Sequence, residues 1–261
     1  MGTPDHQLSL ALDLGNSAGK AGLFRGKDIE EPVLRFSYDE WRLVDEWVTN
    51  RGVKNIVYSS VANVPPPELV DNWKQAGVSV LSLKPGSPLP FASLYATPET
   101  LGQDRIAAVM GLKLWATIPT NPAPATSPYL IVDAGTCVTM DLVGADGLHH
   151  GGNISPGLRM RLRAMHEFTA RLPQPEPGQP AGEVGLSTVA ALQHGGGRGL
   201  VYELEGLYAR LLPKHPGLHV LLTGGDGAWL ADQLQLPCSY DPYLVLRGLL
   251  QILSTYETTE S

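Results

Sequence analysis

The feature that most constrains this 261-residue chain is a pattern that occurs twice. One apolar run leads to Asp13 in LALDLGNS, and another leads to Asp133 in LIVDAGTC, 120 positions later. In each copy a glycine follows the aspartate by two positions, a hydroxyl-bearing residue comes soon after, at Ser17 or Thr136, and a further apolar run follows. This pattern is typical of two strands joined by a tight turn. Two ordinary hairpins are the alternative, but two copies at the head of two similar halves favour a duplicated lobe.

The rest of the chain supports an α/β fold. In the first half we predict helices over 40–50, 68–76 and 101–116, and strands over 55–63 and 78–83. In the second half, a strand leads into a helix with an apolar stripe from Leu158 to Leu172, and YLVLRGLLQIL near the C-terminus predicts a helix that packs on the core. We therefore expect two lobes of mixed sheet flanked by helices, facing each other across a cleft. The proline-rich hinge at 119–128 divides them into residues 1–118 and 119–261.

Both predicted hairpin turns have the chemistry to bind phosphate. The backbone N–H groups of a glycine turn and the Ser17 hydroxyl can donate hydrogen bonds to phosphate oxygens. A carboxylate such as Asp13 or Asp133 suits that position only if it holds a cation, or the waters around one, against the phosphates. The P-loop spacing and a dinucleotide-binding GxGxxG after a strand are both absent from the sequence. The run TGGDG at 223–227 could admit a nucleotide base or ribose, or could be an ordinary helix start.

Tyr95 and the run LGQDR at 101–105 form the cluster that most specifically indicates a functional site. At a helix start, Asp104 could accept a proton from a substrate hydroxyl, and Arg105 could hold a substrate carboxylate through two hydrogen bonds. The alternative is a helix-capping aspartate beside a solvent-facing arginine.

Composition excludes several classes of protein. The net charge of −7 argues against nucleic acid as the main partner, and the absence of a long apolar run argues against a membrane partner. Cys137 and Cys238 are too few for a disulfide framework and have no zinc-site spacing. The N-terminus does not resemble a secretory signal, so we expect a reducing cytoplasm.

These motifs, in their order, resemble the type III pantothenate kinase family. The resemblance runs from about Leu8 to Leu253 and rests on LALDLGNS, Tyr95 with LGQDR, DAGTCVTMD, GGNISPGLRMR, LSTVAALQHG and LTGGD. LGxDR and GGxIxPGLxM are specific to that family, whereas the first hairpin alone marks the superfamily of acetate and sugar kinases, Hsp70 and actin. The fold it implies is a pair of duplicated ribonuclease-H-like lobes.

The resemblance also implies an activity and its residues. It implies ATP-dependent phosphorylation of the hydroxyl of pantothenate to 4′-phosphopantothenate, the first step of coenzyme A biosynthesis, with Asp104 as the catalytic base. The residues that would bind pantothenate are Tyr95, Gly102, Gln103, Asp104, Arg105 and Thr188. Those that would bind ATP with Mg²⁺ are Asp13, Leu14, Gly15, Asn16, Ser17, Ala18, Gly19, Lys20 and Thr136. Asp133 would bind a monovalent cation, K⁺ or NH₄⁺.

The family consists of homodimers in which the partner subunit closes the pantothenate site. The helix from Leu158 to Leu172 and its neighbours are the expected interface. Two other functions stay open: a non-catalytic nucleotide-binding accessory or regulatory protein, since the family includes Bvg accessory factors, and a kinase for another hydroxy acid. The intact set of Tyr95, Asp104 and Arg105 favours an enzyme over a pure nucleotide binder.

Overall fold

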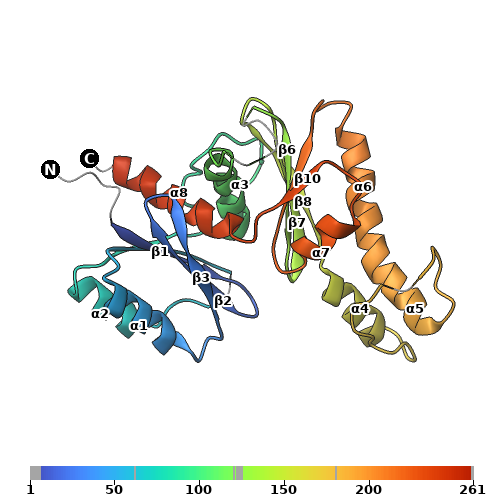
Figure 1. The fold of residues 1–261 in the computed structure, drawn as a ribbon, viewed down its shortest axis with the longest axis horizontal. Coiled ribbons are helices and arrows are strands. Elements are labelled where there is room, and N and C mark those ends of the chain that lie inside the picture. Colours follow the sequence, from blue (N-terminus) through green and yellow to red (C-terminus); the bar gives the residue numbers. More distant parts are fainter. Residues whose placement is uncertain (1–6, 62, 120, 122–125, 180, 260–261) are drawn as a thin grey trace. The chain divides into compact units, whose positions relative to one another are not determined.

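The chain forms two compact units. The computed structural model describes residues 7–61, 63–119, 121, 126–179 and 181–259. One unit comprises Met1–Asn121 together with Tyr243–Ser261, and the other comprises Pro122–Pro242. Each unit holds one five-stranded sheet with helices against it (Figure 1). The predicted α/β fold of two duplicated lobes is confirmed.

The sheet of the first unit has the strand order β3-β2-β1-β4-β5. Its strands are β1 Leu8–Leu14, β2 Gly19–Arg25, β3 Asp28–Phe36, β4 Asn55–Ser60 and β5 Ser79–Ser82. The first three are antiparallel neighbours, whereas β4 runs parallel to β1 and β5 parallel to β4. Apolar residues on β1, β2 and β4 are fully buried, which explains why those strands were recognisable. β3 was not predicted, because most of its residues are polar or exposed at the sheet edge.

Four helices complete the first unit: α1 Trp41–Arg51, α2 Pro67–Gln75, α3 Gln103–Trp115 and α8 Leu244–Thr259. Figure 1 shows α1 and α2 on one face of this sheet and α3 beside α8 on the other. Gly111 and Gly248 let α3 and α8 approach closely, since a Cβ on Gly248 would lie 1.7 Å from the carbonyl oxygen of Ala107. The C-terminal helix, expected in the lobe of residues 119–261, belongs to the first unit, where it packs on α3.

The sheet of the second unit repeats that topology, with the order β10-β9-β6-β7-β8. Its strands are β6 Tyr129–Ala134, β7 Cys137–Val143, β8 His149–Pro156, β9 His219–Thr223 and β10 Cys238–Tyr240. Here β6, β7 and β8 are antiparallel neighbours, and β9 and β10 continue the sheet in parallel. Asp13 pairs with Ser59 on β4, and Asp133 pairs with Thr223 on β9. The two aspartates therefore hold equivalent positions in the two sheets.

The helices of the second unit are α4 Leu158–Glu167, α5 Thr188–Gln193, α6 Gly199–Leu211 and α7 Gly227–Gln233. A π-helical turn over His194–Arg198 contains the three successive glycines at 195–197 and joins α5 directly to α6. A Cβ on Gly196 would lie 2.8 Å from a Leu162 methyl carbon, so glycine at this position permits close packing against α4.

Two sequence predictions concern segments outside these elements. The hinge predicted at 119–128 includes residues 120 and 122–125, which lie outside the described residues. Within the described ranges, no helix combines the length and apolar character needed to cross a membrane.

Candidate active site

The turn between β1 and β2 presents backbone and hydroxyl donors at the end of a buried strand. Asp13 is the last residue but one of β1 and is partly buried, whereas Asn16 and Ser17 in the turn are exposed. A Cβ on Gly15 would meet only the carbonyl oxygen of Ala18, at 3.4 Å. The packing of the protein therefore tolerates a side chain at Gly15 with little adjustment, and glycine there leaves the turn backbone open to a ligand.

Tyr38 holds this turn from the side and was missed by the sequence analysis. Its hydroxyl donates a hydrogen bond to the carbonyl oxygen of Gly15. Its ring packs edge-on against the ring of Phe36. A Cβ on Gly19 would lie 2.4 Å from a carbon of the Phe36 ring, so glycine at position 19 leaves room for that ring. The only sequence signal was the aromatic run FSYDEW after β3, which has no motif character.

The environment of Asp13 favours its neutral form. Burial raises the pKa of Asp13 from 3.8 to about 6, and the negative charge of Asp104 adds to that rise. The neighbouring ammonium of Lys20 acts in the opposite direction and lowers the pKa. Two carboxylates that influence each other, Asp13 and Asp104, are thus brought together in the first unit. Hard cations bind to carboxylate oxygens, so this pair suits phosphates that arrive with a cation.

Asp104 lies in the first turn of α3, where the helix dipole favours a carboxylate. The backbone N–H of Arg105 donates to its Oδ1 at 2.9 Å. The carboxylate also folds back over Gly102, where a Cβ would lie 2.5 Å from Oδ1. The glycine of the LGQDR run is therefore needed for the observed position of the Asp104 carboxylate.

Arg105 is buried against Tyr95. Its guanidinium carbon lies 5.2 Å from the centre of the Tyr95 ring, and Nη1 donates to the Tyr95 hydroxyl at 3.4 Å. Arg105 is 3 % exposed, so it is not the solvent-facing arginine of the alternative interpretation. A guanidinium held on an aromatic face has less freedom to lose when it binds an anion.

Gln103, which the resemblance places in the substrate site, makes a hydrogen bond to the sheet. It is 7 % exposed, and its Oε1 accepts a hydrogen bond from the backbone N–H of Ser60 at 2.9 Å. The motif does not indicate that the Gln103 side chain bonds Ser60, because it specifies residue types and not the face of α3 on which each residue lies.

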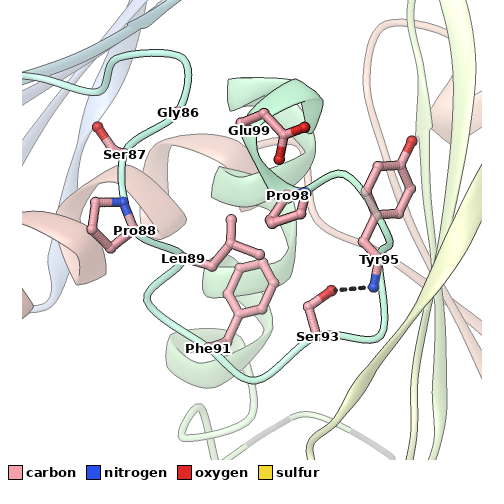
Figure 2. A pocket seen from close by; sticks show the side chains of 9 residues that line it. All are labelled: Gly86, Ser87, Pro88, Leu89, Phe91, Ser93, Tyr95, Pro98 and Glu99. Atoms are coloured by element: carbon pink, nitrogen blue, oxygen red, sulfur yellow. Dashed lines mark hydrogen bonds between the residues drawn. The ribbon is translucent and has the colours of Figure 1, made fainter.

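The loop between β5 and α3 is hollowed beside Tyr95. A pocket of about 350 Å³ lies here. Figure 2 shows Leu89, Phe91 and Pro98, which line it, between Pro88 and Tyr95. The backbone N–H of Tyr95 donates to Ser93 Oγ at 3.0 Å, which orders the loop where it presents the tyrosine. No motif in the sequence indicated this pocket.

In the second unit, the turn between β6 and β7 is shaped by two close glycine contacts. Gly224 has φ +86°, and a Cβ there would lie 2.4 Å from Asp133 Oδ1. A Cβ on Gly157, at the start of α4, would lie 2.3 Å from the carbonyl oxygen of Gly135. The Gly157 N–H donates to the Thr136 carbonyl oxygen at 3.1 Å. Gly157 of GGNISPG and Gly224 of LTGGD thus allow their backbones to pack closely against the second hairpin turn and Asp133.

Asp133 lies close to Gly224, and its charge acts on the Tyr240 hydroxyl. The Tyr240 hydroxyl donates to the Gly224 carbonyl oxygen at 3.4 Å. Burial, followed by the charges of Asp241 and Asp133, raises the pKa of Tyr240. Carboxylate, carbonyl and hydroxyl oxygens are the donors that alkali and alkaline-earth cations prefer, so these residues fit a bound cation. Tyr240 was not predicted, because it precedes the last helix and belongs to no motif.

Thr136 and Thr188 are exposed residues of the second unit. Thr188 is the first residue of α5, and the Ser187 hydroxyl at the N-cap accepts from the N–H of Ala190 at 3.2 Å. The predicted substrate residues Tyr95, Gly102, Asp104 and Arg105 are brought together in the first unit, whereas Thr188 belongs to the second.

Comparisons with known proteins agree with these motifs. The profile of the family described as type III pantothenate kinase matches residues 9–210. A protein of that name from Bacteroides fragilis is 38 % identical over 250 residues, covering 95 % of this chain and 98 % of the relative. Another from Flavobacterium johnsoniae is 32 % identical over 244 residues, covering 93 % and 96 %.

Solved structures show the same fold. A Baf family protein from Campylobacter jejuni has a TM-score of 0.54 at 22 % identity, with coverage of 96 % of this chain and 99 % of its own. The activator of 2-hydroxyisocaproyl-CoA dehydratase from Clostridium difficile has a TM-score of 0.54 at 11 % identity, with coverage of 97 % of both chains. The profile match and the near full-length sequence matches show that the chain belongs to the type III pantothenate kinase family.

Proposed function

We propose that this protein transfers the γ-phosphoryl group of ATP to the hydroxyl of pantothenate and so forms 4′-phosphopantothenate at the start of coenzyme A biosynthesis. The family membership supports the reaction. The observation that carries it in this chain is the ordered cluster of Asp104, Arg105 and Tyr95 at the start of α3. A protein that only bound nucleotide would not need this cluster.

Asp104 is the catalytic residue for the acceptor alcohol. Its carboxylate orients the pantothenate hydroxyl and receives its proton late, since the transition state of phosphoryl transfer is loose. Arg105 binds the pantothenate carboxylate, and Tyr95, Gly102 and Thr188 complete the substrate contacts. The reaction then depends more on alignment and charge neutralisation than on a strong base.

The turn after β1 binds the phosphates of ATP. Backbone N–H groups and the Ser17 hydroxyl over residues 13–20 donate to phosphate oxygens, and Thr136 in the second unit contacts the nucleotide. Asp13 would hold the magnesium ion that accompanies ATP, or its waters, and the ion would neutralise charge on the phosphates.

Asp133 binds a monovalent cation, K⁺ or NH₄⁺, with the nearby oxygens of Gly224 and Tyr240 as further candidate ligands. We expect turnover to fall at least about 10-fold when K⁺ is replaced by a large organic cation, because negative charge around the phosphates is then less well screened. Initial rates at constant ionic strength in K⁺, NH₄⁺, Na⁺ and tetramethylammonium chlorides test this. Equal rates in all four salts would contradict the role of Asp133.

A second copy of the chain is the proposed protein partner. Phe168 and Leu186, in the second unit near α4 and α5, are 85 % and 95 % exposed, and such apolar exposure is typical of an interface. Sedimentation is expected to give twice the chain mass of 28.0 kDa.

The free thiols of Cys137 and Cys238 suit a reducing cytoplasm, which we propose as the location of this protein.

Gly102→Ala is expected to reduce turnover about 10- to 100-fold with little change in stability, because the new Cβ would displace the Asp104 carboxylate from its observed position. The carboxylate is the end of a flexible side chain, so the fold accommodates the change. Gly206→Ala on α6 is the matched control, since a Cβ there meets nothing within 4 Å. Steady-state rates and thermal unfolding of both variants provide the measurement, and an unchanged rate in Gly102→Ala would refute this role of Gly102.

The purified protein with ATP, Mg²⁺, K⁺ and pantothenate tests catalysis itself. Phosphorus NMR is expected to show a phosphomonoester appearing in step with ADP. Binding of ATP without any phosphomonoester would instead identify a non-catalytic accessory protein.

A further inference from the structure

Gln103 lies between the acceptor-alcohol site and the sheet, and its contacts are those of a structural tie. It is the first residue of α3 and precedes Asp104. Its side chain is buried, and its Oε1 accepts the N–H of Ser60 at 2.9 Å. Ser60 is the last residue of β4 and pairs with Leu14 at the end of β1, one position beyond Asp13.

The sheet explains why Ser60 needs such a partner. Alternate residues of a strand direct their N–H groups to opposite neighbours. The N–H of Val61 donates to Leu14 on β1, so the N–H of Ser60 faces the opposite side, toward β5. That strand ends at Ser82, which pairs with Tyr58, and no residue of β5 is left for Ser60. Gln103 supplies the missing acceptor and so continues the hydrogen bonding of β4 beyond the end of β5.

This hydrogen bond joins two parts of the site that would otherwise repel each other. The carboxylates of Asp13 and Asp104 interact unfavourably when both are charged. The N-cap of α3 is Gly102, which has no side chain that could form a capping hydrogen bond and anchor the first turn. A bond from that turn to the strand beside β1 holds Asp104 in place against the repulsion.

We propose that Gln103 is a positioning residue for phosphoryl transfer: its bond to the Ser60 N–H sets the position of Asp104 relative to the end of β1, and Gln103 itself does not contact the substrate. This inference rests on the proposed role of Asp104 as the base. It assigns to Gln103 a role different from the substrate contact that the motif implied.

Gln103→Met tests the proposal, because methionine fills a similar volume without an acceptor of comparable strength. Turnover number is expected to fall about 10-fold or more, while KM for pantothenate and for ATP stays within about 2-fold. The Ser60 amide is expected to lose protection from hydrogen exchange, measured by NMR. Gln103→Asn, whose amide is one methylene too short to reach Ser60, is the second variant and is expected to behave in the same way. Gln75→Met, at an exposed position on α2, is the matched control.

The outcomes separate the two roles of Gln103. A rise in KM for pantothenate alone would identify Gln103 as a substrate contact and overturn the proposal. An unchanged turnover number with an unprotected Ser60 amide would also overturn it. If Asp104→Asn kept its activity, the base assignment would fail, but exchange at Ser60 would still report independently whether the hydrogen bond exists.

Discussion

Replacing Asp104 with asparagine is expected to lower turnover by about 100-fold or more while the fold stays intact. Asparagine matches the size of aspartate and can still accept the Arg105 N–H, which at present donates to Oδ1 at 2.9 Å. It cannot take a proton from the pantothenate hydroxyl. The variant therefore separates the proton acceptor from the structure that surrounds it.

Asp71→Asn is the control for this substitution, because Asp71 is exposed on α2 in the same unit. Steady-state kinetics and thermal unfolding of both variants provide the comparison. We expect the control to behave like the unmodified protein in both measurements. Near-native phosphorylation of pantothenate by Asp104→Asn would show that Asp104 is not the base.

Asp13→Asn is expected to abolish most turnover and at the same time to stabilise the protein. Loss of the carboxylate removes a charge that holds cation-bound phosphates, and turnover is expected to fall about 100-fold. At pH 8 the same change removes a charge whose burial opposes folding. We expect a gain of about 1 to 3 kcal/mol in the free energy of unfolding at that pH.

The sign of this effect follows from the pKa of Asp13. Because burial raises that pKa from 3.8 to about 6, the folded protein holds the proton more tightly than the unfolded chain does. The folded state of the unmodified protein is therefore penalised as the pH rises from about 4 to about 6, and the penalty stays constant above that range. Below about pH 4 Asp13 is protonated in both states and the penalty is absent.

Urea unfolding at pH 4 and pH 8 measures the difference between Asp13→Asn and the unmodified protein. The stabilisation should be present at pH 8 and lost at pH 4, and Asp71→Asn should show no such change. A variant that was less stable at pH 8, or equally stabilised at both values, would contradict the burial of a charged Asp13. Opposite effects on activity and stability are expected where a site keeps a costly charge for function.

The duplicated fold was predictable because both copies of the hairpin carry their signal in a short, local pattern. Asp13 and Asp133 each follow a fully apolar run, and they occupy equivalent positions beside β4 and β9. The edge strand β3 has no such pattern, since its side chains are mostly polar or exposed. The packing of α8 on α3 depends on residues far apart in the chain, and the local sequence of an apolar helix does not indicate which element it packs against.

The cluster of Tyr95, Asp104 and Arg105 was also predictable from the sequence, but the contacts that hold it in place were not. The burial of Arg105 against Tyr95 and the direction of Gln103 toward Ser60 are tertiary contacts across 10 and 43 positions. Tyr38 supports the first hairpin turn through a hydrogen bond to the Gly15 carbonyl oxygen, and Tyr240 donates to the carbonyl oxygen of Gly224, which lies against Asp133. Such bonds require a tyrosine at the right place in space and leave no spacing rule in the sequence.

Phosphorylation of pantothenate is the activity that we propose for this site. Its most direct test is kcat/KM of the purified protein, with ATP, Mg²⁺ and K⁺, for pantothenate, for the uncharged alcohol pantothenol and for a panel of other small hydroxy acids. We predict the highest value for pantothenate and a large loss for pantothenol, because Arg105 then has no carboxylate to bind. A comparable or higher value for another hydroxy acid, or no phosphorylation of pantothenate, would contradict the proposed activity.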